Sequence, residues 1–123
     1  MRSFRELKVW QKCHLITLDV YKATAGFPKH EQFGLTRQLR RSAASVPQNI
    51  AEGCGRDSGP DFARFLQIAL GSASETEYHI LLAADLGYIE VAYARQLEER
   101  VIEVKRMLSS LILKVRHDSA SES

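Results

Sequence analysis

Apolar residues recur at helical spacing in four segments of the chain, and short breaks containing glycine and proline separate them. The segments cover about residues 4–24, 35–53, 58–87 and 91–116. No run alternates apolar and polar residues between hairpin turn signals, so no strand is expected. Helices of these lengths with short connections pack as antiparallel neighbours. The pattern therefore predicts an all-α fold, an antiparallel up-down-up-down four-helix bundle.

The segment 4–24 carries two adjacent apolar stripes, which is more than one bundle seam requires. The first stripe consists of Leu7, Trp10, His14, Leu18 and Tyr21. The second consists of Val9, Cys13, Ile16 and Val20. We expect the spare stripe to face another subunit; the alternative is a helix buried more deeply in its own bundle. After this segment, Phe27 and Phe33 are expected to plug one end of the core.

The segment 35–53 combines an apolar stripe with an internal proline. The stripe is formed by Leu35, Leu39, Ala43, Val46 and Ile50. Pro47 lacks the amide that would donate to the Ala43 carbonyl, and its ring clashes with that carbonyl, so a kinked helix is predicted. Gly53 and Gly55 are expected to end the helix, because glycine adopts the left-handed conformation found at helix C-termini.

Polar residues follow the apolar stripe of segment 35–53 along one flank. They are Gln38, Ser42, Ser45, Asn49 and Glu52. A comparable flank on segment 58–87 consists of Ser72, Glu75 and His79. If the two flanks meet, they form a partly buried network that fixes helix register, because buried polar groups must satisfy one another. A ligand or partner site and plain solvent exposure are the alternatives. The candidate residues of this network or site are Gln38, Ser45, Asn49, Glu52, Ser72 and Glu75.

The last two segments have clear start and packing signals. Ser58 and Asp61 resemble a capping box, and Pro60 lies in the first turn, where it costs no hydrogen bond. Apolar residues in segment 91–116 alternate three- and four-residue spacings, as in a coiled coil. They are Ala94, Leu97, Val101, Val104, Leu108, Leu111 and Val115. We therefore expect one bundle domain over residues 1–117 and a disordered tail over the small, polar residues 118–123.

Charge is unevenly spread along the 123 residues, although the net charge is only +2. Residues 1–60 carry ten Lys and Arg against five Asp and Glu, whereas residues 61–123 carry seven against ten. Arg37, Arg40 and Arg41 lie on one helix and are candidate contacts for nucleic-acid phosphates. The alternative is that helices of opposite charge pack together and that these arginines form a solvated face.

Several classes of function receive no support from the sequence. The apolar runs are too short to span a membrane, and the N-terminus lacks the apolar region of a signal peptide, so a cytoplasmic location is expected. The histidines are scattered, and no metal or cofactor motif is present, although Glu75 and His79 are four residues apart. Cys13 and Cys54 are expected to be buried thiols. The sequence thus predicts no enzyme, no metal and no cofactor.

Two longer motifs of the chain are Gly34-Leu35-Thr36-x-Gln38-x-x-Arg41 and Ser45-Val46-Pro47-x-Asn49-Ile50-Ala51-Glu52-Gly53. They resemble the signature of the bacterial four helix bundle protein family, also called the 23S rRNA-intervening sequence protein family. Further matches are Leu7-x-x-Trp10, Phe27-Pro28-x-x-Glu31, Phe65-Leu66-x-x-Ala69-x-Gly71-Ser72-x-x-Glu75 and Leu86-Gly87-Tyr88. The resemblance covers about residues 4–115, and it implies a four-helix bundle that assembles as a homopentamer. It also relates the chain to accessory proteins of retroelement reverse transcriptases, which bind the polymerase and nucleic acid through basic surfaces.

The leading hypothesis is therefore a non-enzymatic, oligomeric scaffold or assembly protein, a pentamer of unknown biological role. The second hypothesis is an accessory factor that binds RNA, DNA or a polymerase through the basic helix face. The third is a small-molecule binder or enzyme that uses Asn49, Glu52 and Glu75.

Overall fold

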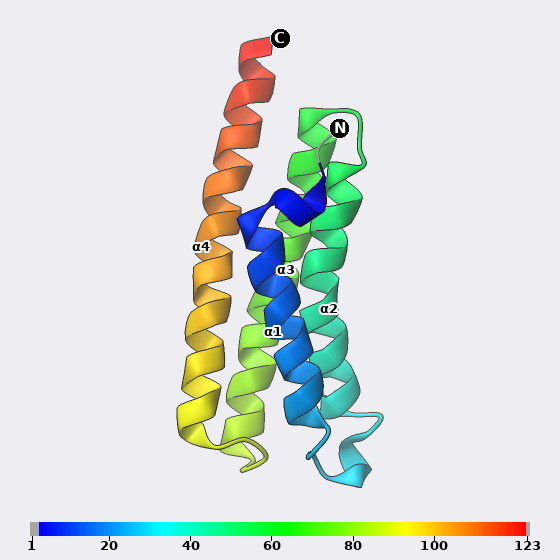
Figure 1. Cartoon of the computed structure of the whole chain (residues 1–123), viewed down its shortest axis with the longest axis vertical. Coiled ribbons are helices and arrows are strands. Elements are labelled where there is room, and N and C mark those ends of the chain that lie inside the picture. The colour runs from blue at the N-terminus through cyan, green and yellow to red at the C-terminus, as the bar shows by residue number, and fades with distance from the viewer. Residues whose placement is uncertain (1–2, 123) are drawn as a thin grey trace.

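The computed structural model describes residues 3–122 as a bundle of four long helices, with no strand in that part of the chain (Figure 1). The elements are η1 (Phe4–Glu6), α1 (Lys8–Thr24), η2 (Lys29–Glu31), α2 (Leu35–Cys54), α3 (Gly59–Asp85) and α4 (Val91–Glu122). Consecutive helices run in opposite directions, and α1 also packs against α4. Helices α1 and α3 lie diagonally across the bundle, as do α2 and α4. The predicted all-α four-helix bundle is confirmed.

The helix boundaries follow local capping chemistry with two departures from the sequence-based expectation. The side chain of Ser58 accepts the Asp61 amide at 3.2 Å, as predicted. Residues 4–6 form a separate 3-10 turn, and α1 begins after the extended Leu7. The expected left-handed end of α2 is wrong, because Gly53 is helical and Gly55 has φ of −85°. Gly53 serves close packing instead: a Cβ there would lie 2.8 Å from the Phe62 ring.

Apolar side chains from all four helices form one continuous core. The most deeply buried include Val20, Leu39, Ile50, Leu66, Ile80, Leu97, Val104 and Leu108. Phe27 plugs one end as predicted, with its ring 5.4 Å from that of Tyr88. The same prediction for Phe33 is wrong, since 73% of this residue is exposed. Its ring lies outside the core, 5.3 Å from the guanidinium carbon of Arg37.

Pro47 lies inside α2 and is buried there. The proline has no amide for the carbonyl oxygen of Ala43, and a buried carbonyl without a donor is costly. The hydroxyl of Thr17 on α1 lies 3.1 Å from that oxygen and 2.8 Å from the carbonyl oxygen of Cys13. A neighbouring helix thus supplies the donor that the proline removes. The kink itself stays a prediction.

Helix α4 is longer than the sequence pattern indicated, because it continues through residues 118–122, where a disordered tail was expected. Continuing an existing helix adds a hydrogen bond per residue without a new nucleus. Ser121 also donates to the His117 carbonyl at 3.1 Å. The last turns pack on the start of α3, where a Cβ on Gly59 would overlap the Ser119 hydroxyl. Residue 123 lies outside the described residues.

Ion pairs between helices neutralise some of the charged side chains of the bundle. Lys12 and Glu103 pair at 3.1 Å, and Asp19 and Arg100 pair at 2.8 Å, both between α1 and α4. Because α1 and α4 both carry more Lys and Arg than Asp and Glu, these contacts are local ion pairs rather than the packing of helices of opposite net charge. Within the described residues, no helix is both long and apolar enough to cross a membrane.

Candidate functional site

Six polar side chains meet where α2 packs against α3, and we call this group the polar seam. It consists of Ser42, Ser45 and Asn49 from α2 and Ser72, Thr76 and His79 from α3. The positions recur at helical spacing on both helices, so each helix directs its polar flank towards the other. The seam runs beside the core rather than through its centre.

One half of the polar seam is built around Ser45. Its hydroxyl lies 2.9 Å from the hydroxyl of Ser72, which links the two helices. The side-chain amide of Asn49 donates to the Ser45 hydroxyl at 2.9 Å and is 2.8 Å from the Ser45 carbonyl oxygen. Three of the six candidate network residues are therefore brought together.

The other half of the polar seam is built around Ser42. Thr76 lies with its hydroxyl 3.0 Å from the Ser42 hydroxyl and 2.8 Å from the Ser72 carbonyl oxygen. The Ser42 hydroxyl is also 3.0 Å from Nδ1 of His79. Burial lowers the pKa of His79, and the nearby charge of Glu75 opposes that shift. A lowered pKa favours the neutral imidazole, whose Nδ1 can accept the hydroxyl proton.

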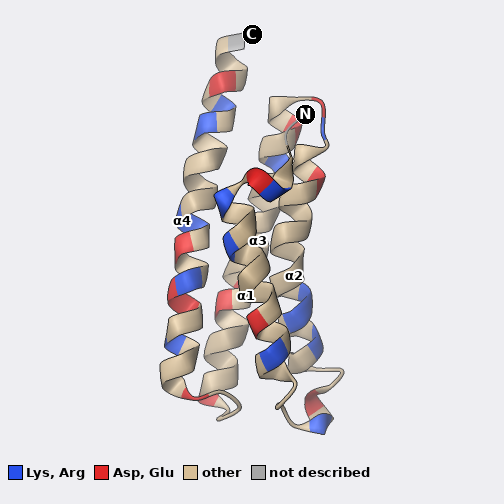
Figure 2. Cartoon of the chain, viewed as in Figure 1, with Lys and Arg blue, Asp and Glu red and all other residues tan. Residues whose placement is uncertain are grey.

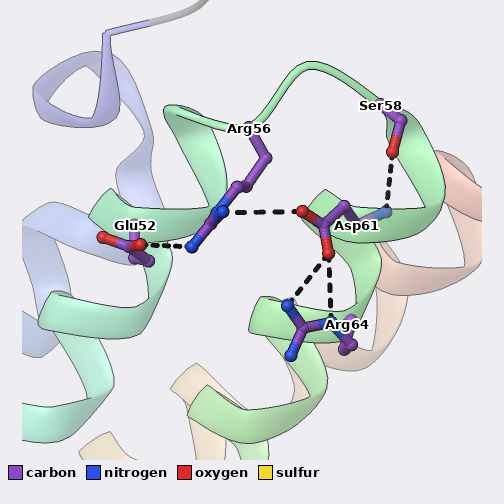
Figure 3. Close-up of polar contacts among 5 residues, drawn as sticks. All are labelled: Glu52, Arg56, Ser58, Asp61 and Arg64. Atoms are coloured by element: carbon purple, nitrogen blue, oxygen red, sulfur yellow. Dashed lines mark hydrogen bonds and ion pairs between the residues drawn. The ribbon is translucent and has the colours of Figure 1, made fainter.

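The remaining three candidates, Gln38, Glu52 and Glu75, are exposed and outside the hydrogen-bonded group. Glu52 accepts a hydrogen bond from Arg56 at 2.6 Å instead. Figure 3 shows how this pair continues to Asp61, which lies 3.7 Å from Arg56 and 3.0 Å from Arg64. This chain of charges spans the connection between α2 and α3. Exposed ion pairs of this kind stabilise a fold by only about 0–1 kcal/mol each.

A second group of functional candidates lies at the opposite end of α2, and we call it the arginine cluster. It comprises Arg37, Arg40 and Arg41. Figure 2 shows basic segments gathered on this part of α2, at the end of the bundle away from the labelled chain termini. The three arginines line a cavity of about 390 Å³ together with Tyr21, Gln32, Phe33 and Thr36. No acidic residue contributes to this lining.

The three arginines are not equivalent. Arg40 is held in place, because it donates to the Thr24 hydroxyl at 2.7 Å and to the Tyr21 carbonyl at 3.2 Å. Its guanidinium carbon also lies 4.6 Å from the centre of the Tyr21 ring. Arg37 and Arg41 are exposed, and no carboxylate of residues 3–122 pairs with either. These two side chains are therefore available to an anion.

The nearest acidic group at the start of α2 is engaged in capping. The carboxylate of Glu31 accepts the Leu35 amide at 3.1 Å and the Tyr88 hydroxyl at 2.9 Å. These two hydrogen bonds lower the pKa of Glu31, so the carboxylate is charged at neutral pH. Glu31 thus accepts a hydrogen bond from the first amide of α2, and it does not line the cavity of the arginine cluster.

Cys13 does not have the lowered pKa of an activated nucleophile. Burial raises the pKa of Cys13 to about 12, whereas a reactive cysteine needs a lowered pKa. Cys54 is buried as well, and neither residue forms a disulfide. Across residues 3–122, no three His, Cys, Asp or Glu side chains converge as a metal site requires.

Sequence reasoning missed several contributors to these groups. Neither Thr76 on α3 nor Thr17 on α1 was among the candidate residues, because a lone threonine among apolar residues gives no pattern of its own. A signal for Thr17 did exist, because Pro47 leaves a carbonyl that needs a donor from another helix. Tyr21 and Phe33 were assigned to apolar packing, although both line the arginine cluster.

Comparisons with known proteins agree with the fold and the motifs. The sequence model of the family described as 23S rRNA-intervening sequence protein matches residues 5–110, which confirms the resemblance. A similar solved structure is a protein of unknown function from the S23 ribosomal protein family of Bacteroides thetaiotaomicron. It is 29% identical, with a TM-score of 0.76, and the match covers 85% of this chain and 97% of that chain. No curated protein matches the sequence.

Proposed function

This chain belongs to the 23S rRNA-intervening sequence protein family, and on that basis we propose that it is a non-enzymatic assembly protein that works as a homo-oligomer. The observation that carries the proposal is the first apolar stripe of α1, the one that contains Leu18 and Tyr21, which the chain itself leaves partly uncovered. The family and its solved relative have no assigned activity, so the proposed role is structural: one chain presents surfaces that another copy covers.

Only one of the two apolar stripes of α1 is fully buried in the core, although Leu7 and Trp10 of the other stripe pack against its edge. Val9, Cys13, Ile16 and Val20 are all at most 4% exposed. On the outer side, Leu18 is 44% exposed and its neighbour Leu15 is 55% exposed. Exposed leucines on adjacent helical positions form a patch that favours burial against a partner, at about 25 cal/mol per Å² of apolar surface removed from water.

The outward face of α3 offers a second surface of the same kind. Ile68 is 42% exposed, Tyr78 is 58% exposed, and Gly71 lies between them on the helix. Glycine inside a helix costs roughly 1 kcal/mol relative to alanine. A Cβ at Gly71 would meet no atom of the chain within 4 Å, so packing inside the subunit does not explain it. The missing side chain would allow a helix of another copy to approach the backbone of α3 closely at this position.

The positions of these two faces favour a ring over a two-fold dimer. Because α1 and α3 are diagonal, their outward faces lie on different sides of the bundle. If the α1 face of one copy contacts the α3 face of the next, the contact is heterologous, and such contacts close into rings when the rotation permits. Five subunits per ring is the number that the family resemblance implies.

Light scattering coupled to size-exclusion chromatography tests this proposal. The wild-type chain is expected to give a mass about five times that of the 13.9 kDa subunit. Leu18→Glu places a charge in the proposed interface and should lower the mass, whereas Leu113→Glu, on the exposed side of α4, should not. A wild-type monomer across micromolar concentrations contradicts the proposal, and so does equal dissociation by both variants.

Binding of a nucleic acid is the second candidate function, and the arginine cluster favours it. Arg37 and Arg41 lack carboxylate partners among the described residues, and a ring would repeat them in every subunit. Repeated weak contacts increase the overall affinity through effective concentration. Such binding should weaken steeply with salt, because phosphate contacts release counterions.

Fluorescence anisotropy of labelled RNA and DNA over a salt series tests this second function. The double variant Arg37→Ala/Arg41→Ala should lose binding, while Arg116→Ala on the exposed surface of α4 should retain it. Binding that is independent of salt, or equally affected by both changes, counts against the arginine cluster as the contact surface.

A further inference from the structure

We propose that the cavity of the arginine cluster binds a nucleoside 5′-phosphate group, with Arg37, Arg41 and Thr36 receiving the phosphate and Phe33 and Tyr21 flanking the base. This inference shares its arginines with the second candidate function but goes beyond it, because it requires neither a polymer nor an oligomer. It assigns a defined small ligand to one end of a single bundle.

The charge of the cavity selects an anion. Three guanidinium groups contribute to its lining and no carboxylate does. Arg40 is fixed by hydrogen bonds to α1 and supplies a positioned charge, whereas Arg37 and Arg41 have all their donors available. The planar guanidinium fork matches the oxygens of a phosphate in a bidentate manner.

The second observation is the available hydroxyl of Thr36. This residue is only 9% exposed and lines the cavity, yet no hydrogen bond of its side chain occurs among residues 3–122. The other buried threonines of the chain all have hydroxyl partners: Thr17, Thr24 and Thr76. Every buried side-chain oxygen or nitrogen of the described residues has a partner, so the Thr36 hydroxyl oxygen faces the solvent-filled cavity, where it can donate to a phosphate oxygen.

The aromatic lining indicates what the phosphate is attached to. Phe33 is the most exposed large apolar residue of the described chain, and Tyr21 is 45% exposed on the facing helix. Exposed aromatic faces beside guanidinium groups stack flat, electron-rich rings such as nucleobases. The cavity volume of about 390 Å³ lies within the range of roughly 300–1,000 Å³ that small-molecule sites occupy.

Calorimetric titration of the full chain with adenosine 5′-monophosphate, adenosine and inorganic phosphate tests the proposal. The monophosphate is expected to bind at least about tenfold more tightly than adenosine or inorganic phosphate, since both the charged and the aromatic contacts contribute. Absence of binding at millimolar concentration overturns the proposal. Equal affinity for inorganic phosphate also overturns it, because the cavity would then be a general anion surface.

Variants locate the ligand in the cavity. Thr36→Val removes the hydroxyl with little change of shape, and Arg41→Gln removes one available charge; each should weaken the monophosphate by about tenfold or more. Arg116→Gln, far from the cavity on exposed α4, is the matched charge control and should change nothing. Circular dichroism confirms that each variant is folded. Equal weakening by Arg41→Gln and Arg116→Gln places the ligand elsewhere and overturns the assignment.

A parallel anisotropy experiment separates this inference from nucleic-acid binding. A short oligonucleotide with a 5′-phosphate should bind more tightly than the same strand with a 5′-hydroxyl, and free monophosphate should compete with it. If both strands bind equally and the monophosphate does not compete, the inference fails while nucleic-acid binding stands. If the monophosphate alone binds, nucleic-acid binding fails while the inference stands.

Discussion

The seam between α2 and α3 and the seam between α3 and α4 share one helix but are built from different chemistry. The polar seam joins α2 to α3 through paired hydroxyls, an amide and an imidazole. The other seam is mainly apolar, with Leu97, Val101, Val104 and Leu108 at most 2% exposed. A single ion pair, between Lys105 and Glu77 at 3.0 Å, lies across it among the described residues. Apolar packing is non-directional and tolerates exchange of similar side chains, whereas hydrogen bonds demand one partner at one distance. We therefore expect the apolar seam to contribute more to the free energy of unfolding, and the polar seam to specify the alignment of α2 with α3.

The largest expected effect comes from breaking the apolar seam. Leu108→Ala removes a fully buried side chain and should lower the free energy of unfolding by about 2–5 kcal/mol. Urea denaturation at one fixed protein concentration measures this loss. Leu113→Ala, at a 68% exposed position of the same helix, is the control and should stay within about 0.5 kcal/mol of wild type. A smaller loss for Leu108→Ala than for any change in the polar seam reverses the comparison.

The next prediction concerns the Thr17 hydroxyl, which donates to the Ala43 carbonyl oxygen in place of the amide missing at Pro47. Thr17→Val keeps the shape of the side chain and strands the Ala43 carbonyl, so about 1–3 kcal/mol should be lost. Pro47→Ala restores the missing amide, and the cost of Thr17→Val should then shrink in the double variant. A double-mutant cycle by urea denaturation measures the coupling. Additive free energies in that cycle exclude the proposed link between the two residues.

A smaller effect distinguishes pairing from simple polarity within the polar seam. Ser45→Ala leaves the Ser72 hydroxyl without its partner, and Ser72→Ala leaves the Ser45 hydroxyl with the Asn49 amide alone, so each should cost about 1 kcal/mol. The double variant should cost less than the sum, because neither hydroxyl of the pair remains and the Asn49 amide keeps the Ser45 carbonyl oxygen as an acceptor. Thermal unfolding of all four proteins checks this order. Strict additivity indicates that the two hydroxyls act independently.

The smallest effect is a pH dependence confined to the polar seam. Because the folded pKa of His79 lies below its unfolded value of 6.5, the unfolded chain binds more protons in mildly acid solution. Stability should be fully present above pH 6.5 and fall as the pH drops from there towards the lowered folded pKa. His79→Gln should flatten this part of the profile, measured by unfolding midpoints across that range. An unchanged profile in the variant assigns the dependence to another group.

Elements were more predictable from the sequence than the contacts between them. Helical periodicity and the Ser58 cap are local properties, so the four helices and the start of α3 followed directly. Gly53 and Phe33 were misjudged because their roles depend on the position of another helix or side chain. The expected network lies on the predicted flank of each helix, but Gln38, Glu52 and Glu75 are exposed at the solvent side of that flank. A shift of this size separates burial from exposure on a helix and cannot be read from spacing alone.

The contact between Thr17 and the carbonyl opposite Pro47 also constrains how the sequence can change over evolutionary time. A lineage that first replaces Pro47 regains a backbone amide, and position 17 is then free to accept valine. A lineage that first replaces Thr17 passes through a destabilised protein in which the Ala43 carbonyl oxygen has no hydrogen-bond donor. The two substitutions therefore have a permissive order and a restrictive order, although both lead to the same final sequence.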